Sequence, residues 1–338
     1  MKMKRKTIIM AFCGLLLATG GCQPSGSDYK GKLRVKTEPV TDLEFHRYED
    51  VLFNLDTANF QEELLAIQND YKPFLEGDLS NPLAIKYLKD FATDTFSINL
   101  YHIVKEVYPD LRPVEEIVQT VYRHFNYYYP EIKLPNKIFT CVSGINPDNT
   151  AVMVLDDALV ISLDWYLNHD AVYDRVGMPQ YLSERTNIGR LPHDLGHQVY
   201  LHAIYQWRKQ TNLLEEMVNM GKIDYFIEAL YPDIIDTDLL GYTPQQLEWA
   251  EVNEGNIWAD MVGNQRLFAT GLEMYRIFLS DGPFTNEYSH EAPSRLGEFI
   301  GLHIVRSYMG NNEVSLQELM KDNDLQGIFQ KSKYKPKK

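Results

Sequence analysis

Cysteine is scarce in this sequence, which has only Cys13, Cys22 and Cys141 among its 338 residues. Cys13 and Cys22 belong to an N-terminal segment with the features of an export signal, so Cys141 has no intramolecular partner. A disulfide-stabilised fold is therefore excluded, although an exported chain could form disulfides. Cys141 lies in the strand-like run 138–142, and no catalytic-cysteine signature surrounds it. We expect it to pack as a small buried side chain.

A long apolar run is also missing at the N-terminus. The run from Ile8 to Leu17 is too short to span a bilayer as a mature helix. It follows a basic start and precedes four small residues and then Cys22, a pattern typical of a bacterial lipoprotein signal peptide. Thr19 stands where such signals usually have leucine, so an ordinary secretory signal is the alternative.

These features predict four parts of the chain. Residues 1–21 form the signal peptide, and residues 22–32 form the lipidated Cys22 and a polar tether. Residues 33–330 form one domain, because no linker, repeat or low-complexity block divides them. Residues 331–338 form a lysine-rich tail that we expect to be solvated and frayed.

Basic residues are outnumbered: 33 Lys and Arg face 47 Asp and Glu, which gives a formal charge of −14. Residues 1–21 hold four of the positive charges and no acid, so the mature chain is near −18. Such a surface repels nucleic acids and anionic lipid headgroups, so we exclude nucleic acid as a partner.

Hydrophobic periodicity predicts a mainly helical α+β domain around a small antiparallel sheet. Helical patterns cover residues 60–74, 82–91, 96–108, 113–129, 193–210, 213–230, 244–270 and 293–309. Strand-like runs cover residues 33–40, 137–142, 152–155 and 158–163. The last three runs follow one another across turn-forming residues, which favours an antiparallel meander.

One motif suggests chemistry. His193 and His197 are four residues apart, so on a helix both imidazoles lie on one face, close enough to share a metal ion. Zinc peptidases use H-E-x-x-H, in which the glutamate activates the zinc-bound water. Here Asp194 replaces that glutamate and is one methylene shorter. Gly196 also weakens the helix, by about 1 kcal/mol relative to alanine.

The sequence offers two candidate positions for the third zinc ligand of such a site. A zincin of the gluzincin type, in which a small sheet precedes the histidine helix, takes this ligand from a glutamate on a later helix. At the first candidate position stands Met220, whose thioether does not serve as a zinc ligand in such a site. Glu254, before Gly255, has the right chemistry but comes late in the chain. The sequence therefore suggests a degenerate zincin-like core.

Several short motifs, taken in order, carry a family resemblance. They are HRYEDVLFNLD (46–56), ISLDWYL (161–167), MPQYL (178–182), MGKIDYF (220–226), WADM (258–261), GPFT (282–285), SRLG (294–297), IVRSYM (304–309) and SKYKP (332–336). In this order they resemble the GldB-type gliding-motility lipoproteins of Bacteroidetes, over most of the mature chain. The resemblance implies an envelope lipoprotein tied to surface gliding, which is distantly similar to zincin peptidases but has lost their catalytic groups. The resemblance implies no catalytic residue. The His-Asp-Leu-Gly-His sequence at residues 193–197 departs from the family pattern.

The leading hypothesis is a non-catalytic lipoprotein without a cofactor, which acts through protein contacts with an envelope machine for gliding or secretion. We expect a lipid anchor in the outer membrane facing the periplasm, because residues 23–27 lack the acidic cluster that favours surface display. The alternative is a zinc-dependent hydrolase with His193, His197 and Glu254 as ligands and Asp194 as the base. A glycan-binding protein is a third hypothesis, which rests on 22 tyrosines and 4 tryptophans.

Overall fold

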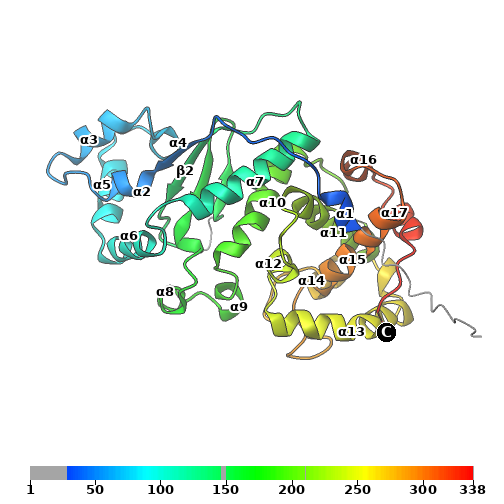
Figure 1. Cartoon of the computed structure of the whole chain (residues 1–338). Coiled ribbons are helices and arrows are strands. Elements are labelled where there is room, and N and C mark those ends of the chain that lie inside the picture. The colour runs from blue at the N-terminus through cyan, green and yellow to red at the C-terminus, as the bar shows by residue number, and fades with distance from the viewer. Residues whose placement is uncertain (1–28, 146–149, 210, 338) are drawn as a thin grey trace, which may run out of the picture.

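The computed structural model describes residues 29–145, 150–209 and 211–337. The predicted signal peptide, Cys22 and most of the predicted tether lie outside the described residues. The described chain is mainly helical with one small sheet (Figure 1), which confirms the predicted α+β class.

Short helices and one strand form the first third of the chain, ahead of the longer helix α7. The elements are α1 (Tyr29–Leu33), β1 (Glu44–Arg47), α2 (Tyr48–Leu52), α3 (Phe60–Ile67), α4 (Lys72–Leu75), α5 (Pro82–Thr93), α6 (Thr95–Val107) and α7 (Arg112–Tyr128). The predicted strand 33–40 is wrong. Leu33 instead ends α1, and the strand that pairs with the sheet is Glu44–Arg47.

The rest of the sheet and a set of longer helices follow. The elements are β2 (Lys137–Cys141), β3 (Val152–Val154), β4 (Leu159–Ser162), η1 (Leu163–Trp165), α8 (Asp170–Arg175), α9 (Gln180–Ser183), η2 (Ile188–Arg190), α10 (Leu191–Ala203), α11 (Leu213–Leu230), α12 (Asp236–Leu240), α13 (Pro244–Gly263), η3 (Arg266–Phe268), α14 (Leu272–Phe278), α15 (Leu296–Asn311), α16 (Leu316–Lys321) and α17 (Leu325–Ser332). The predicted helix 213–230 is confirmed at both ends, whereas α10 and α13 end seven residues before the predicted ends of their helices.

The sheet has the order β1-β2-β4-β3 and is mixed. Strand β2 pairs in parallel with both β1 and β4, and only β3 and β4 are antiparallel. The predicted antiparallel meander is therefore wrong, because β4 lies between β2 and β3. Strand periodicity indicates that a run is a strand, but it does not say which strand becomes its neighbour.

The two faces of the sheet contact two separate hydrophobic clusters. Ile138, Leu159 and Ile161 pack into the large cluster with the long helices. Phe139 and Cys141 pack into a smaller cluster with α2, α3 and α5. This alternation follows from the two-residue period of a strand. Cys141 is buried and free, which confirms its predicted packing role.

Helix α11 runs through the centre of the helical part and is buried along most of its length. It packs against α15, and their backbones come very close at Gly221 and Gly301. A Cβ on Gly301 would overlap the carbonyl oxygen of Met217, and a Cβ on Gly221 would overlap that of Gly301. Two glycines therefore set the distance between the two central helices.

The first described helix, α1, is fastened to the end of α15. The Lys32 Nζ donates to the backbone oxygens of Met309 and Asn312, at 2.9 and 2.8 Å. The guanidinium of Arg306 lies over the Tyr29 ring, 5.2 Å from its centroid. Arg306 is itself buried between the carboxylates of Glu228 and Asp236. Part of the predicted tether, residues 29–32, is thus built into the domain.

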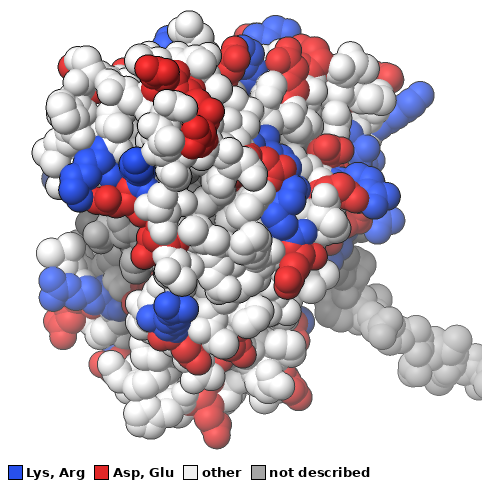
Figure 2. Space-filling model, turned by 90° about the vertical axis from the view of Figure 1, so that its left-hand side faces the viewer, with Lys and Arg blue, Asp and Glu red and all other residues white. Residues whose placement is uncertain are grey.

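Charges of both signs are interspersed on the face shown in Figure 2, at the end of the molecule formed by α3 and α5. Neither sign forms a continuous patch there. Within the described ranges, every helix falls short of the length and apolar character needed to cross a bilayer.

Candidate functional site

Helix α10 carries the predicted histidine pair. The short helix η2 leads into it, and Pro192 occupies its first turn, where a missing N–H has no cost. Leu191, Leu195 and Val199 are fully buried on one side of the helix. Gly196 lets α10 approach Ile227 of α11, because a Cβ at this position would come within 3.1 Å of the Ile227 side chain.

The two imidazoles lie on one helix face, as predicted. The rings of His193 and His197 are nearly parallel, with an interplanar angle of 4° and centroids 6.1 Å apart. Burial lowers the pKa of both rings, that of His193 to about 3, and the nearby Arg190 charge adds to the effect. Both histidines are therefore neutral near pH 7.

Both ring nitrogens of His193 have partners. The Arg190 Nη2 lies 3.1 Å from His193 Nε2, and Asp194 Oδ1 lies 2.9 Å from His193 Nδ1. Arginine only donates hydrogen bonds, so Nε2 must accept, and the neutral ring then carries its hydrogen on Nδ1 and donates it to Asp194. The Nε2 lone pair that a metal would need is occupied by the guanidinium of Arg190.

Asp194, the base of the hydrolase hypothesis, is held by three side chains. Its carboxylate accepts from the Tyr166 hydroxyl at 2.7 Å and from His193, and Arg190 Nε lies 3.4 Å away. Burial alone would raise the pKa of Asp194, but the hydrogen bond from His193 and the charge of Arg190 lower it overall. The ionised carboxylate therefore holds the side chains of Tyr166, His193 and Arg190 in place.

Arg190 extends this network to α12. Its Nη1 donates to the backbone oxygens of Asp238 and Leu239, at 2.6 and 2.7 Å. The group of Arg190, His193, Asp194 and Tyr166, which we call the Arg190 network, therefore joins η1, η2, α10 and α12. Its hydrogen bonds close on one another, which is the arrangement of a structural polar core.

Glu254, the candidate third ligand, lies in a different cluster. Its Oε1 accepts from His303 Nδ1 and from the Tyr334 hydroxyl, both at 2.8 Å. The backbone N–H of Lys337 donates to Oε2 at 3.3 Å. The structure therefore brings His193 and His197 together and gives Glu254 other partners. Across the described ranges, no three His, Cys, Asp or Glu side chains converge as metal ligands would.

The same contacts show that the predicted frayed tail is wrong. Tyr334 packs edge-on against Trp258, with ring centroids 5.2 Å apart, and its hydroxyl reaches the buried Glu254. Lys333 turns the chain with a φ of 54°, directly after α17. The lysine content hid this contact, because a half-buried tyrosine, rather than the charge run, holds the segment against the domain.

A second charged cluster, which is partly buried, was missed by sequence reasoning. Arg295 forms an ion pair with Glu298 at 2.9 Å and lies 3.4 Å from Asp281. Asp281 in turn forms a bidentate ion pair with Arg185. Burial raises the pKa of Asp224 on α11 far above its usual range, and the Oδ2 atom of Asp224 is buried without a hydrogen-bond partner in the described structure. Arg295 and Asp224 both fall in the short motifs that carry the family resemblance, so those motifs build the buried polar core.

The fold and these clusters define a helical α+β domain with closed, buried polar networks. The model of the gliding motility protein GldB family matches residues 30–336, and the chain belongs to this family. No curated protein and no solved structure showed significant similarity to the chain.

Proposed function

We propose that this protein is a lipid-anchored component of the bacterial envelope that serves gliding motility through contacts with other envelope proteins. The family match over residues 30–336 carries the association with gliding motility. The anchor rests on the basic start, the short apolar run and the small residues before Cys22. The proposed location is the outer membrane, with the domain in the periplasm.

A non-catalytic role is supported by the chemistry of the Arg190 network. A zinc ion needs a free imidazole lone pair, and the Nε2 atom of His193 uses its lone pair to accept from Arg190. The Asp194 carboxylate, which would have to activate water, is bound by Tyr166 and His193 instead. The same residues join four elements, which is a sufficient reason for their presence.

Comparison of two chromosomal variants tests whether the lipid anchor or the histidine pair matters more for function. Cys22→Ala removes the proposed lipid site, and a double His193→Gln, His197→Gln variant removes both imidazoles. We expect the first to reduce colony spreading strongly and the second to have the smaller effect once protein levels are matched. The opposite ranking would show that chemistry at the histidines matters more than anchoring.

Metal analysis tests the hydrolase alternative directly. The purified protein, equilibrated with excess zinc and desalted, is expected to keep less than about a tenth of an equivalent. An Arg190→Ala variant serves as the comparison, because it frees the His193 Nε2 lone pair. Stoichiometric zinc in the wild-type protein, lost in the double histidine variant, would establish the metal site and overturn the non-catalytic proposal.

Protease treatment of intact cells tests the location. A periplasmic domain stays intact until the outer membrane is permeabilised. Release of the domain from untreated cells would place it on the cell surface instead.

A further inference from the structure

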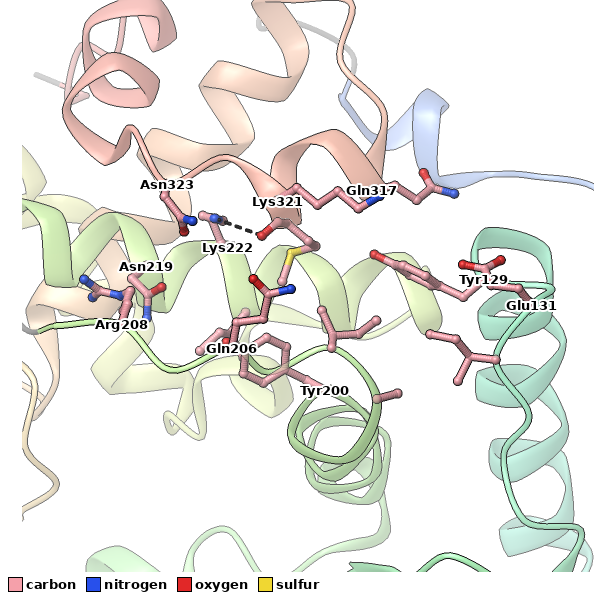
Figure 3. Close-up of a pocket in the computed structure, with 15 residues that line it drawn as sticks. Tyr129, Glu131, Tyr200, Gln206, Arg208, Asn219, Lys222, Gln317, Lys321 and Asn323 are labelled. Atoms are coloured by element: carbon pink, nitrogen blue, oxygen red, sulfur yellow. Dashed lines mark hydrogen bonds between the residues drawn. The ribbon is translucent and has the colours of Figure 1, made fainter.

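A polar pocket of about 210 Å³ lies apart from the Arg190 network, between the end of α7, the segment after α10, the middle of α11 and the end of α16 (Figure 3). We call it the Lys222 pocket. Its volume is below the roughly 300–1,000 Å³ of pockets for drug-sized ligands. Besides Lys222 and Tyr129, the amide side chains of Gln206, Asn219, Gln317 and Asn323 line it. A pocket with this lining suits a small polar ligand better than an apolar one.

Lys222 is a buried cation in this pocket, with 4% of its surface exposed. Its Nζ donates to the backbone oxygens of Asp322 at 2.6 Å and Met320 at 3.4 Å. No carboxylate in the described structure lies within ion-pair distance of this ammonium. A lysine ammonium has three donors, so one remains for a ligand. Buried charges are normally paired, so this ammonium without an ion-pair partner can bind an anionic group of a ligand.

The charges of the other lining residues do not cancel that of Lys222, which the nearby Asp322 carboxylate offsets only in part. Arg208 is paired with Glu216, so its charge is already compensated. Lys321 is an exposed lining residue, and Glu131 is the one acid among the lining residues. The pocket therefore has a net positive lining on a chain that is acidic overall.

Tyr129 supplies a second group without a partner. The residue is 5% exposed, and its hydroxyl is buried with no hydrogen-bond partner in the described structure. Figure 3 shows its ring extending from the side of α7 into the pocket. Burial raises the pKa of Tyr129, so the hydroxyl stays protonated and can donate. A buried hydroxyl without a partner is unfavourable, and a hydrogen-bond acceptor on a ligand would offset this cost.

We propose that the Lys222 pocket binds a small polar carboxylate, with the carboxylate at the Lys222 ammonium and a second acceptor of the ligand at the Tyr129 hydroxyl. The side-chain amides supply further donors and acceptors for a hydroxylated or amide-containing body. A peptide C-terminus and a sugar acid share this chemistry. The site is independent of the proposed role in motility, because it rests on this pocket alone.

Isothermal titration of the purified full-length protein with four probes tests the proposal. The probes are alanyl-alanine, its C-terminal amide, glucuronate and glucose. We expect at least one of the two carboxylates to bind at least tenfold more tightly than its counterpart without a carboxylate, since a charge-assisted hydrogen bond is lost. Binding of the dipeptide alone identifies a peptide end, binding of glucuronate alone identifies a sugar acid, and binding of both identifies carboxylate recognition in general.

Two variants separate ligand binding from a structural role. Lys222→Met keeps the apolar stem of the side chain and removes the charge, and we expect at least a tenfold loss of affinity. Tyr129→Phe removes a hydroxyl that has no protein partner, so stability should not fall, while affinity should fall about three- to tenfold. Tyr128→Phe and Lys86→Met are the matched controls, because neither residue lines the pocket, and both should bind as the wild type does.

Three results would overturn the proposal. The first is an absence of binding by both carboxylates up to about 10 mM. The second is equal binding of each carboxylate and of its counterpart without a carboxylate. The third is unchanged affinity in Tyr129→Phe and Lys222→Met, which would leave Lys222 only as a cap for the end of α16. None of these results bears on colony spreading, so this proposal and the motility proposal fail separately.

Discussion

The buried His193 should make the protein sensitive to mild acid. Its pKa is about 3 in the folded protein because burial and Arg190 disfavour the imidazolium. In the unfolded chain the pKa is about 6.5. Between these two values the unfolded state binds more protons at this residue, so the free energy of unfolding falls as the pH drops below about 6.5.

The size of the effect follows from the two pKa values. At pH 5 the unfolded imidazole is almost fully protonated and the folded one is neutral. Between pH 7 and pH 5 the protonation of His193 in the unfolded chain therefore lowers the free energy of unfolding. The decrease corresponds to the roughly 1.5 pH units between the unfolded pKa and pH 5, or about 2 kcal/mol. The side chain is 13% exposed, so solvent screening does not reduce this figure greatly.

Urea unfolding at pH 7 and pH 5, with linear extrapolation, measures this contribution in the wild type and in His193→Gln. The variant loses the Arg190 and Asp194 contacts at both pH values, so only the pH-dependent difference reports the titration. The wild type should lose about 2 kcal/mol more between the two pH values than the variant does. His202→Gln, an exposed position on the same helix, should behave like the wild type.

Other titrating groups, including the buried acids, cancel in this comparison as long as they are unchanged by the substitution. A pH-dependent difference below about 0.5 kcal/mol would refute the reasoning. It would mean that His193 is already protonated at pH 7 or stays readily protonated when folded, and the assigned donor and acceptor roles in the Arg190 network would then be wrong.

Three further predictions concern packing and the C-terminal contact. Gly301→Ala should destabilise the protein by about 1–3 kcal/mol or more, because the new Cβ would meet a backbone carbonyl. Gly263→Ala is the control, since open space surrounds that position and the substitution should not destabilise the protein. Thermal unfolding of both variants tests this prediction. Tyr334→Phe removes the hydroxyl bound to Glu254 and should lower the free energy of unfolding by about 1.5–3 kcal/mol. The variant should also speed proteolysis of the C-terminal tail, and an unchanged cleavage rate would contradict the contact of the tail with the domain. Thr243→Ala removes the capping box of α13 and should lower the free energy of unfolding in urea by about 1 kcal/mol.

Helix positions were largely predictable from the sequence, because buried side chains recur at helical spacing. The helix Arg112–Tyr128 shows this best, since Val114, Val118, Val121 and Phe125 are buried at helical spacing along one face. Strand order was not predictable. Three short runs in sequence suggested a meander, but pairing depends on which strand fills the space beside β2, and this is a tertiary choice.

The functional reasoning failed for a similar reason where it depended on single residues. The spacing of His193 and His197 correctly placed both rings on one helix face, but it carried no information about Arg190, whose position in η2 determines what His193 can do. Likewise, Glu254 was assessed only as a metal ligand. Its actual partners, His303 and Tyr334, come from segments about 50 and 80 residues further along the chain.

The attachment of α1 to α15 has a consequence for how the protein stands on a membrane. With Tyr29 fixed by Arg306, only residues 23–28 separate the domain from the proposed lipid on Cys22. Seven residue steps at full extension reach at most about 25 Å. The start of α1 would then lie within about 25 Å of the proposed lipid anchor. The end formed by α3 and α5, which lies far from α1 in Figure 1, would then be the part of the domain farthest from the proposed anchor.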